Sequence, residues 1–263
     1  MFKIFLIISI LCLLSYCYFI EPNMLTITRY RIKCSNLSGL KAVFVGDFHI
    51  KKNGEERLDK IVKLIKAQEP DIIFSTGDFV AGHTLKTSLP PEKIAEKLGE
   101  LKPKLGFYTV LGNHDWWADG KLITEVLRKN GIVVLENSSV SFIYKNKPVY
   151  IAGIEDLQTR NPDITSAMEH TSSPLIMLTH TPDMFPKIPD NVFLTLAGHT
   201  HGGQVRIPFL GALIIPSEYR EKYAKGKITE NNHTMIVTKG IGTSILPFRF
   251  NCTPEIVIIN FEE

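Results

Sequence analysis

The sequence predicts an α/β fold in which buried strands alternate with amphipathic helices. Short apolar runs of strand length recur along the 263 residues, helical patterns separate the earlier runs, and short polar turns separate several later ones. With 44% hydrophobic and 22% charged residues, the chain can bury one full core. We therefore expect one folded domain, residues 22–263, behind a short N-terminal segment, residues 1–21.

The N-terminal segment contains an uncharged apolar run, residues 4–20, flanked by Lys3 and Glu21. A run of this length is at the short end of what spans a bilayer. It ends in Ser15-Tyr16-Cys17-Tyr18, without the small residues of a signal-peptidase site, which favours an uncleaved single-pass membrane anchor over a cleavable signal. More basic residues follow the run closely than precede it, which favours a cytoplasmic folded domain.

The first half of the folded segment alternates strands with helices. Helices are expected at residues 55–68, 91–101 and 121–130, and the first of them places apolar residues at helical spacing opposite a charged face. This alternation predicts right-handed crossovers between parallel strands. The expected strands are residues 24–34, 41–45, 71–76 and 106–111.

The second half of the chain has a different character. Close-spaced strands at residues 132–135, 140–144 and 148–153 indicate an antiparallel meander, which forms either a second sheet or an extension of the first. No repeat or linker divides the domain. Further strands are expected at residues 175–179, 192–196, 235–238 and 255–261.

Charge and cysteine content exclude several classes of function. The net charge is +3 without a Lys/Arg block, so no nucleic-acid partner is expected. The sequence has no Cys-x-x-Cys pair, so neither a zinc knuckle nor a redox motif is supported. We expect Cys34 and Cys252 to be free thiols, although a disulfide stays open if their neighbouring strands pair antiparallel in an oxidising compartment.

Asp, His and Asn side chains directly follow five of the expected strands. In open α/β sheets, ligands gather at the carboxyl ends of strands. One such residue alone is as readily a turn or a helix cap, but all five groups consist of metal-ligand types and contain neither Lys nor Arg. The donors are Asp47 and His49, Asp78, Asn113 and His114, His180, and His199 and His201.

These donors predict a binuclear metal site. They exceed what one tetrahedral ion uses, and oxygen with imidazole ligands suits Mn, Fe or Zn, of which we expect Mn²⁺. One carboxylate shared between two ions about 3.5–4 Å apart would leave room for water and substrate. Two divalent ions outweigh the charges of Asp47 and Asp78, so the site would attract a phosphate ester, and a bridging water would lose its proton and become the nucleophile.

The order of these motifs resembles the signature of the calcineurin-like metallophosphoesterases. Residues 201–208 and 240–254 are similar to the membrane-anchored bacterial branch of YkuE- and YaeI-type phosphodiesterases. The resemblance implies two mixed β-sheets packed as a sandwich flanked by helices, with residues 22–263 as the catalytic domain. The motifs that carry it are Asp47-x-His49, Gly77-Asp78, Gly112-Asn113-His114-Asp115, His180 and Gly198-His199-x-His201.

The resemblance also implies a role for each site residue. His114 would contact the scissile phosphate or protonate the leaving group, with Asp115 fixing the orientation of its imidazole. Asp78 would bridge the two metals. The remaining ligands would be Asp47, His49 and His201 for one metal, and Asn113, His180 and His199 for the other.

One position departs from the family pattern. Many relatives carry Gly-Asp-x-x-Asp, whereas Ala81 stands at the fifth position here, so support from that carboxylate is absent or comes from elsewhere. His83 is a nearby candidate, although a solvent-facing loop histidine is the simpler interpretation. Arg206 and Arg249 follow the metal loop and a glycine-rich loop, and each either holds a second phosphate or headgroup or forms a surface ion pair.

The resulting hypothesis is a metal-dependent hydrolase at a membrane surface that cleaves a phosphodiester or pyrophosphate bond by attack of a metal-bridging hydroxide. Some relatives hydrolyse UDP-2,3-diacylglucosamine in lipid A synthesis, so this amphiphile is one candidate among lipid-linked substrates. Phospholipid or envelope phosphodiesters and phosphomonoesters are alternatives. A noncatalytic metal-binding scaffold is a further alternative, which the presence of Asn113, His114 and every ligand disfavours.

Overall fold

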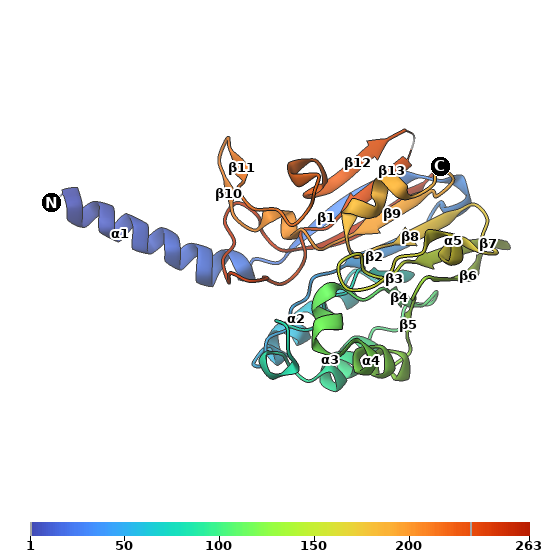
Figure 1. Ribbon diagram of the computed structural model, residues 1–263, viewed down its shortest axis with the longest axis horizontal. Coiled ribbons are helices and arrows are strands. Elements are labelled where there is room, and N and C mark those ends of the chain that lie inside the picture. Colours follow the sequence, from blue (N-terminus) through green and yellow to red (C-terminus); the bar gives the residue numbers. More distant parts are fainter. Residues whose placement is uncertain (1, 232) are drawn as a thin grey trace.

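Two six-stranded mixed β-sheets lie at the centre of the fold and helices cover their outer faces (Figure 1). The computed structural model describes residues 2–231 and 233–263. Residues 1 and 232, which belong to the expected anchor and catalytic segments, lie outside the described residues. The arrangement confirms the expected sandwich of two mixed sheets.

The first sheet combines strands from both ends of the chain. Strands β2 to β5 run parallel to one another, as the strand–helix alternation predicts, while β14 is antiparallel to β2 and parallel to β1. In sheet order the strands are β1 (Thr26–Lys33), β14 (Glu255–Glu262), β2 (Lys41–Val45), β3 (Ile72–Ser75), β4 (Phe107–Thr109) and β5 (Ile132–Val134).

The parallel pairing of β1 with β14 decides the question of the disulfide. Thr26 lies opposite Glu255 and Lys33 lies opposite Glu262, so Cys34 and Cys252 are at opposite ends of this pair. Both cysteines are free within the described chain. The antiparallel pairing that a bridge requires is therefore not formed, in agreement with the expectation of two free thiols.

Three helices cover the outer face of the first sheet: α2 (Glu55–Lys66), α3 (Pro91–Gly99) and α4 (Asn113–Lys129). Their apolar faces share one buried cluster with the sheet, as Ile61 and Ile123 do with Val43. Helix α4 begins at Asn113, not near residue 121 as the sequence predicted, and it contains a kink at Asp119. The amphipathic pattern is interrupted at that kink, which explains why the first turns were not predicted.

The second sheet contains the meander and the later apolar runs. Strands β7, β8, β9 and β13 are parallel, while β6 and β12 pair antiparallel at the two edges. Edge strand β12 is half-exposed and was not predicted, and neither was the short helix α5 (Ile164–Met168). The sheet order is β12 (Gly226–Glu230), β13 (His233–Val237), β9 (Leu194–Ala197), β8 (Leu175–Leu178), β7 (Lys147–Gly153) and β6 (Ser138–Tyr144).

An apolar layer holds the two sheets together. Phe44 and Val110 from the first sheet region share one buried cluster with Ile151, Ile176 and Leu196 of the second. Each fully buried side chain of this kind contributes about 1.5–3 kcal/mol relative to an exposed one. This layer fixes the sheets against each other, and thereby the loops that follow β2, β3, β8 and β9.

Helix α1 (Phe2–Ser15) projects away from the sheets and is exposed along its length (Figure 1). The helical stretch Phe2–Asn23 is long and apolar enough to cross a membrane, and these are the properties of an anchor or of a signal sequence alike. Its base contacts the folded domain. Cys17 O accepts a hydrogen bond from Arg249 N at 3.0 Å, and Glu21 Oε1 accepts one from Cys252 N at 2.5 Å.

A small hairpin lies beside the base of α1 (Figure 1). It consists of β10 (Arg206–Ile207) and β11 (Gly211–Ala212), which pair antiparallel. The preceding segment is joined to the C-terminal loop by a bridge between Val205 and Phe250. This hairpin was not predicted from the sequence, because its strands are only two residues long.

Candidate metal centre

The metal-ligand side chains expected at the strand ends lie together in one buried cluster between the two sheets. The loops that follow β2 and β3 and the start of α4 contribute five of them, and the loops that follow β8 and β9 contribute three. None is more than 7% exposed. The residues are Asp47, His49, Asp78, Asn113, His114, His180, His199 and His201.

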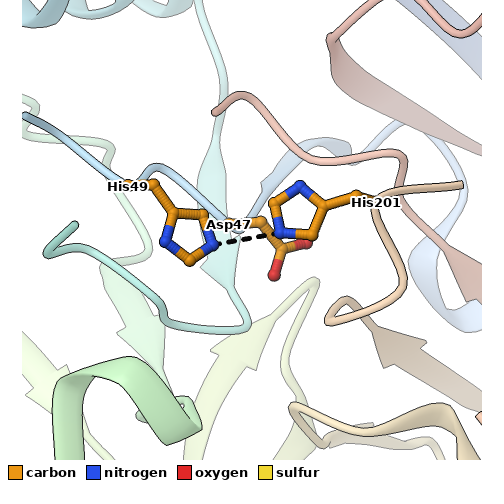
Figure 2. A group of neighbouring side chains, drawn as sticks. All are labelled: Asp47, His49 and His201. Atoms are coloured by element: carbon orange, nitrogen blue, oxygen red, sulfur yellow. Dashed lines mark hydrogen bonds between the residues drawn. The ribbon is translucent and has the colours of Figure 1, made fainter. Parts of the chain in front are cut away.

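Asp47, His49 and His201 form the first group (Figure 2). Their ligand atoms all lie within 4.8 Å of one another. The two imidazoles face each other, with His49 Nε2 3.0 Å from His201 Nε2 and the Asp47 carboxylate beside them. Among the described residues, the buried His201 Nδ1 has no hydrogen-bond partner.

His180 is at the centre of the second group. Its Nε2 lies 2.9 Å from Asn113 Oδ1 and 3.1 Å from His199 Nδ1. The same Nε2 lies 3.4 Å from Asp78 Oδ2. Because His49 Nε2 is also 3.4 Å from Asp78 Oδ2, this carboxylate oxygen lies between the two groups.

These separations are those of ligands that share a metal ion. Two atoms that are each about 2.1 Å from one ion are about 3.0 Å apart at a right angle and about 3.4 Å apart at a tetrahedral angle. Imidazole, carboxylate and amide donors without thiolate suit Mn, Fe or Zn. The side chains present therefore fit divalent metal ions.

The backbone at the cluster is held in an unusual conformation. Five of the ligand residues have a positive φ, which costs about 1–3 kcal/mol for a residue other than glycine and is typical of functional sites. Position 112 also requires glycine, because a Cβ there would lie 2.2 Å from Asp78 Oδ1. The five residues are Asp47 (51°), His49 (43°), Asp78 (54°), His199 (70°) and His201 (51°).

Backbone groups orient the ligands. His180 Nδ1 lies 2.7 Å from Thr76 O, so this nitrogen donates and leaves Nε2 free for a metal. Asp47 Oδ1 accepts a hydrogen bond from His199 N at 2.9 Å, which ties the loops of the two sheets together. Asp78 Oδ1 accepts from His114 N at 2.9 Å, which leaves Oδ2 to face both groups.

Asp115 has a different role from the one that the resemblance implied. Its carboxylate accepts hydrogen bonds from the backbone N–H groups of Asp78 at 2.7 Å and Phe79 at 2.8 Å, and from Gly112 at 3.1 Å. It therefore caps α4 and fixes the loop after β3, and it does not orient the His114 ring. This carboxylate supplies support to the loop in which Ala81 replaces the usual Asp.

His114 is oriented by a carbonyl and a hydroxyl. Its Nδ1 lies 2.9 Å from Gly82 O, so Nδ1–H donates, and its Nε2 lies 3.2 Å from Ser244 Oγ. His114 and His49 line a cavity of about 640 Å³. Lys51, Lys52 and residues 243–247 also line this cavity, so cationic side chains lie close to the ligand cluster.

The cluster shifts the pKa values of its members in opposite directions. Burial raises the pKa of Asp47 to about 7, and it lowers the pKa of His49 and of His199 to about 3. Asp78 and His180 shift in the directions that burial opposes. The charges of His180 and His49 outweigh burial and lower the pKa of Asp78. The charge of Asp78 likewise outweighs burial and raises the pKa of His180 to about 10. Such opposed shifts are typical of functional sites.

The two arginines of the sequence analysis lie outside the ligand cluster. The Arg249 guanidinium is completely buried and donates to backbone carbonyls, including Lys239 O at 2.8 Å and Gly242 O at 2.6 Å. Arg206 donates to Gly202 O at 2.9 Å and pairs with Glu221. Burial argues against substrate binding by Arg249, since its donors hold the glycine-rich loop.

His83 is exposed, as the simpler interpretation of this residue expects. Its ring centroid lies 4.5 Å from that of Trp117 and 5.2 Å from that of His114. It therefore lines the cavity, beyond the part of the loop that Asp115 supports.

Two residues near the site were missed in the sequence. Gln158 Nε2 lies 2.9 Å from His199 Nε2, on the side of the ring opposite the second group. The buried Asp156 accepts from Gln158 N at 3.1 Å and from Thr181 Oγ1 at 3.2 Å. The signal was present, because Asp156 follows the apolar run 148–153 just as the ligands follow theirs.

Comparison with known proteins agrees with this geometry. A family model described as Calcineurin-like phosphoesterase matches residues 40–203. The uncharacterized metallophosphoesterase YkuE of Bacillus subtilis (strain 168) is 30% identical, over 94% of this chain and 89% of the relative. Phosphodiesterase YaeI of Escherichia coli (strain K12) is 29% identical, over 93% and 91%. The UDP-2,3-diacylglucosamine pyrophosphatase LpxG of Chlamydia trachomatis serovar D is 24% identical, over 91% and 90%.

A solved structure supports the fold. NAD nucleotidase (NadN) of Haemophilus influenzae matches with a TM-score of 0.51 at 14% identity, over 77% of this chain and 50% of the NadN chain. This chain thus spans about half the length of that protein, and the likeness concerns the fold alone. From the matched family and its relatives, the chain belongs to the calcineurin-like metallophosphoesterases and is a metal-dependent phosphoester hydrolase.

Proposed function

We propose that this protein binds two divalent metal ions, preferably Mn²⁺, and hydrolyses a phosphodiester or pyrophosphate bond at a membrane surface. The observation that carries the proposal is the position of Asp78 Oδ2, which is 3.4 Å from an imidazole nitrogen of each ligand group. A carboxylate oxygen in this position is suited to bridging two ions. Fe or Zn would suit the same donors.

The proposed ligand sets follow the two groups. Asp47, His49 and His201 would hold one ion, and Asn113, His180 and His199 the other, with Asp78 shared. When bound, the two ions would activate a water molecule and offset the charge that develops on the phosphoryl oxygens. The buried carbonyl of Thr76 would keep the His180 imidazole in the required tautomer.

His114 is the proposed proton donor to the leaving group. The carbonyl of Gly82 accepts its Nδ1–H, so Nε2 is the atom that would carry the transferred proton toward the cavity. Ser244 Oγ, 3.2 Å from Nε2, would help to hold the ring in this orientation. Lys51 and Lys52, which line the same cavity, would attract the anionic substrate.

The proposed substrate is a lipid-linked or envelope-associated phosphoester. Helix α1 would tether the domain as a single-pass anchor, and the tether brings the site to substrates that reside in the membrane. The similarity to LpxG supports UDP-2,3-diacylglucosamine as a candidate, and the similarity to YaeI supports a phosphodiester. The placement of basic residues after the apolar run favours the cytoplasmic face.

An assay of metal-reconstituted protein tests the catalytic proposal against a noncatalytic scaffold. We expect the full-length protein with Mn²⁺ to hydrolyse bis-p-nitrophenyl phosphate, and Asn113→Ala and His114→Ala to be slower by about 10²–10⁴-fold. His170→Gln is the matched control, because this histidine lies on the surface outside the cluster. Equal inactivity of all four proteins with both metals bound would favour the scaffold.

Product analysis tests the substrate. The purified full-length protein is incubated with Mn²⁺ and UDP-2,3-diacylglucosamine, a phospholipid panel or p-nitrophenyl esters, and the products are identified by mass spectrometry. Release of UMP from the first substrate alone would support the nucleotide-linked lipid. Hydrolysis of the other esters without UMP release would contradict it and favour a more general phosphodiesterase or phosphomonoesterase.

A further inference from the structure

We propose that the apolar rim, defined as residues 207–214 of the β10–β11 hairpin together with residues 244–248, inserts into the lipid bilayer beside α1. The catalytic cavity would then receive lipid-linked phosphoesters directly from the membrane. This inference rests on the proposed function and on the anchoring role of α1. It adds a second membrane contact made by the catalytic domain itself.

The hairpin exposes an unusual amount of apolar side chain. Phe209 is 108% exposed and Ile214 is 78% exposed. Leu210 and Leu213 are exposed to a similar degree. Four large apolar side chains gathered on one short hairpin mark an interaction surface, since soluble faces rarely carry such a patch.

The second part of the rim leads into the cavity. Ile245 is 94% exposed, and both Ile245 and Leu246 line the cavity beside His114. The start of the hairpin lies next to this second part, because Gln204, three residues before the hairpin part of the rim, donates from Nε2 to Ser244 O at 2.9 Å. A lipid chain that contacts Ile245 and Leu246 would therefore lie at the mouth of the catalytic cavity.

The base of α1 identifies the bilayer as the occupant of this surface. The rings of Tyr18 and Phe248 have centroids 5.5 Å apart, so the end of the apolar helix contacts the rim itself. Figure 1 shows the hairpin on the side of the domain from which α1 leaves. Tyr18 and the 65% exposed Phe19 are aromatic residues of the kind that lie at membrane interfaces.

Charge on the cavity wall agrees with this occupant. Lys51 and Lys52 line the cavity together with the rim residues. Apolar side chains beside lysines match the two parts of an anionic lipid, which are its acyl chains and its phosphate headgroup. A protein partner is disfavoured as the occupant, because the rim lies at the base of a helix that is itself suited to cross the bilayer.

Fluorescence quenching tests the contact directly. Full-length Phe209→Trp is placed in nanodiscs that hold one copy each, with or without brominated phospholipid, and the signal of unsubstituted protein, which contains Trp116 and Trp117, is subtracted. We expect at least twofold quenching of the introduced indole. Ile143→Trp is the matched control, because Ile143 is 62% exposed on the edge strand β6. It should not be quenched.

Activity on two substrates tests the consequence. We expect a triple variant, Leu210→Ser, Leu213→Ser and Ile214→Ser, to retain hydrolysis of soluble bis-p-nitrophenyl phosphate and to lose at least tenfold in hydrolysis of a bilayer-borne phosphoester. Ile143→Ser should keep both activities. The comparison is made in vesicles at equal protein content, so that tethering by α1 is the same in every sample.

The outcomes separate the two proposals. An unquenched signal from Phe209→Trp, or equal loss of both activities in the triple variant, would overturn the membrane contact. If a second copy of the protein covers the hairpin instead, the emission of Phe209→Trp should shift to the blue only in nanodiscs with two copies, and brominated lipid should not quench it. That result would also overturn the membrane contact. If native protein hydrolyses neither substrate while the Phe209→Trp signal is quenched, the proposed function fails and the membrane contact stands.

Discussion

The ligand cluster and the apolar rim depart from ordinary burial in opposite directions. Asp78 is 1% exposed and His180 is completely buried, whereas Phe209 and Ile245 are almost completely exposed. Both regions border the same cavity, since His114 and Ile245 line it together. Positions where local rules of burial fail are the ones to examine for function. In our proposals the first region carries the chemistry, and the second brings that chemistry to its substrate.

The two regions also differ in how they are held. The cluster is fixed by hydrogen bonds from both sheets, such as His199 N to Asp47 and His180 Nδ1 to Thr76 O. The hairpin contains a two-residue pairing and few buried side chains. We therefore expect substitutions in the cluster to affect every substrate and substitutions in the rim to affect only membrane-borne ones.

The largest effect is expected when the shared carboxylate is removed. Asp78→Asn keeps the side-chain volume but removes the charge between His49 and His180, so both proposed metal groups would lose their shared anionic ligand. Metal catalysis contributes several kcal/mol, so hydrolysis of any substrate should fall by about 10³-fold or more. Activity and metal content by elemental analysis are measured together. Asp163→Asn, at an exposed helix cap, is the control, and native metal content in Asp78→Asn would contradict the assignment.

A smaller effect is expected at Gln158, which contacts the proposed ligand His199. Gln158→Ala removes the side chain next to His199 Nε2, and partners of this kind typically contribute about 10–100-fold to metal affinity or activity. The expected loss is in the affinity for the second metal, with full activity restored by excess Mn²⁺. Titration with Mn²⁺ measures it. Gln68→Ala on the surface should bind metal like the native protein, and an unchanged second affinity in Gln158→Ala would exclude the role.

The raised pKa of Asp47 predicts a pH dependence of metal binding. Burial places this pKa near 7, and a metal requires the deprotonated carboxylate, so affinity should fall as the pH drops below about 7. Asp47 contributes a decrease of about tenfold per pH unit, and His180, whose raised pKa means that it too must lose a proton before it binds a metal, adds to that decrease. Calorimetry at pH 6 and pH 8, in buffers of different ionisation enthalpy, measures the proton release. Identical heats in all buffers would contradict the linkage.

The smallest effect is expected in the rim. Leu213→Ser and Ile214→Ser should change the free energy of unfolding by less than about 0.5 kcal/mol each, because both side chains are mostly exposed. The control Leu196→Ala, completely buried between the sheets, should cost about 2–5 kcal/mol. Denaturant titration of detergent-solubilised protein measures both. A large loss in the serine variants would show that the hairpin supports the fold.

Much of the fold was predictable from local patterns. Continuous apolar runs predicted β2 and β3, and helical spacing predicted α2 with its buried Leu58 and Ile65. The sheet order was not predicted, because the pairing of β1 with β14 joins residues from the two ends of the chain. The edge strand β12 was missed because it contains no continuous apolar run, and the hairpin was missed because its strands are only two residues long.

The site was predictable in composition and less so in detail. Strand ends identified Asp47 and His180 because polar residues there interrupt a buried run. The role of Asp115 was not predictable, because a carboxylate beside His114 in sequence can turn either to the ring or to the backbone. Arg249 appeared suited to phosphate by residue type alone, while its complete burial depends on tertiary packing.

The contacts at the base of α1 link the N-terminal helix to the metal pocket. Cys17 O and Glu21 Oε1 accept hydrogen bonds from Arg249 N and Cys252 N. The Arg249 side chain in turn holds Gly240 O, in the loop packed against Asp47. Proteolytic shedding after Glu21 would remove both acceptors and loosen a wall of the metal pocket. If α1 is the proposed anchor, a domain cut from it would thus hydrolyse phosphoesters more slowly than the anchored protein.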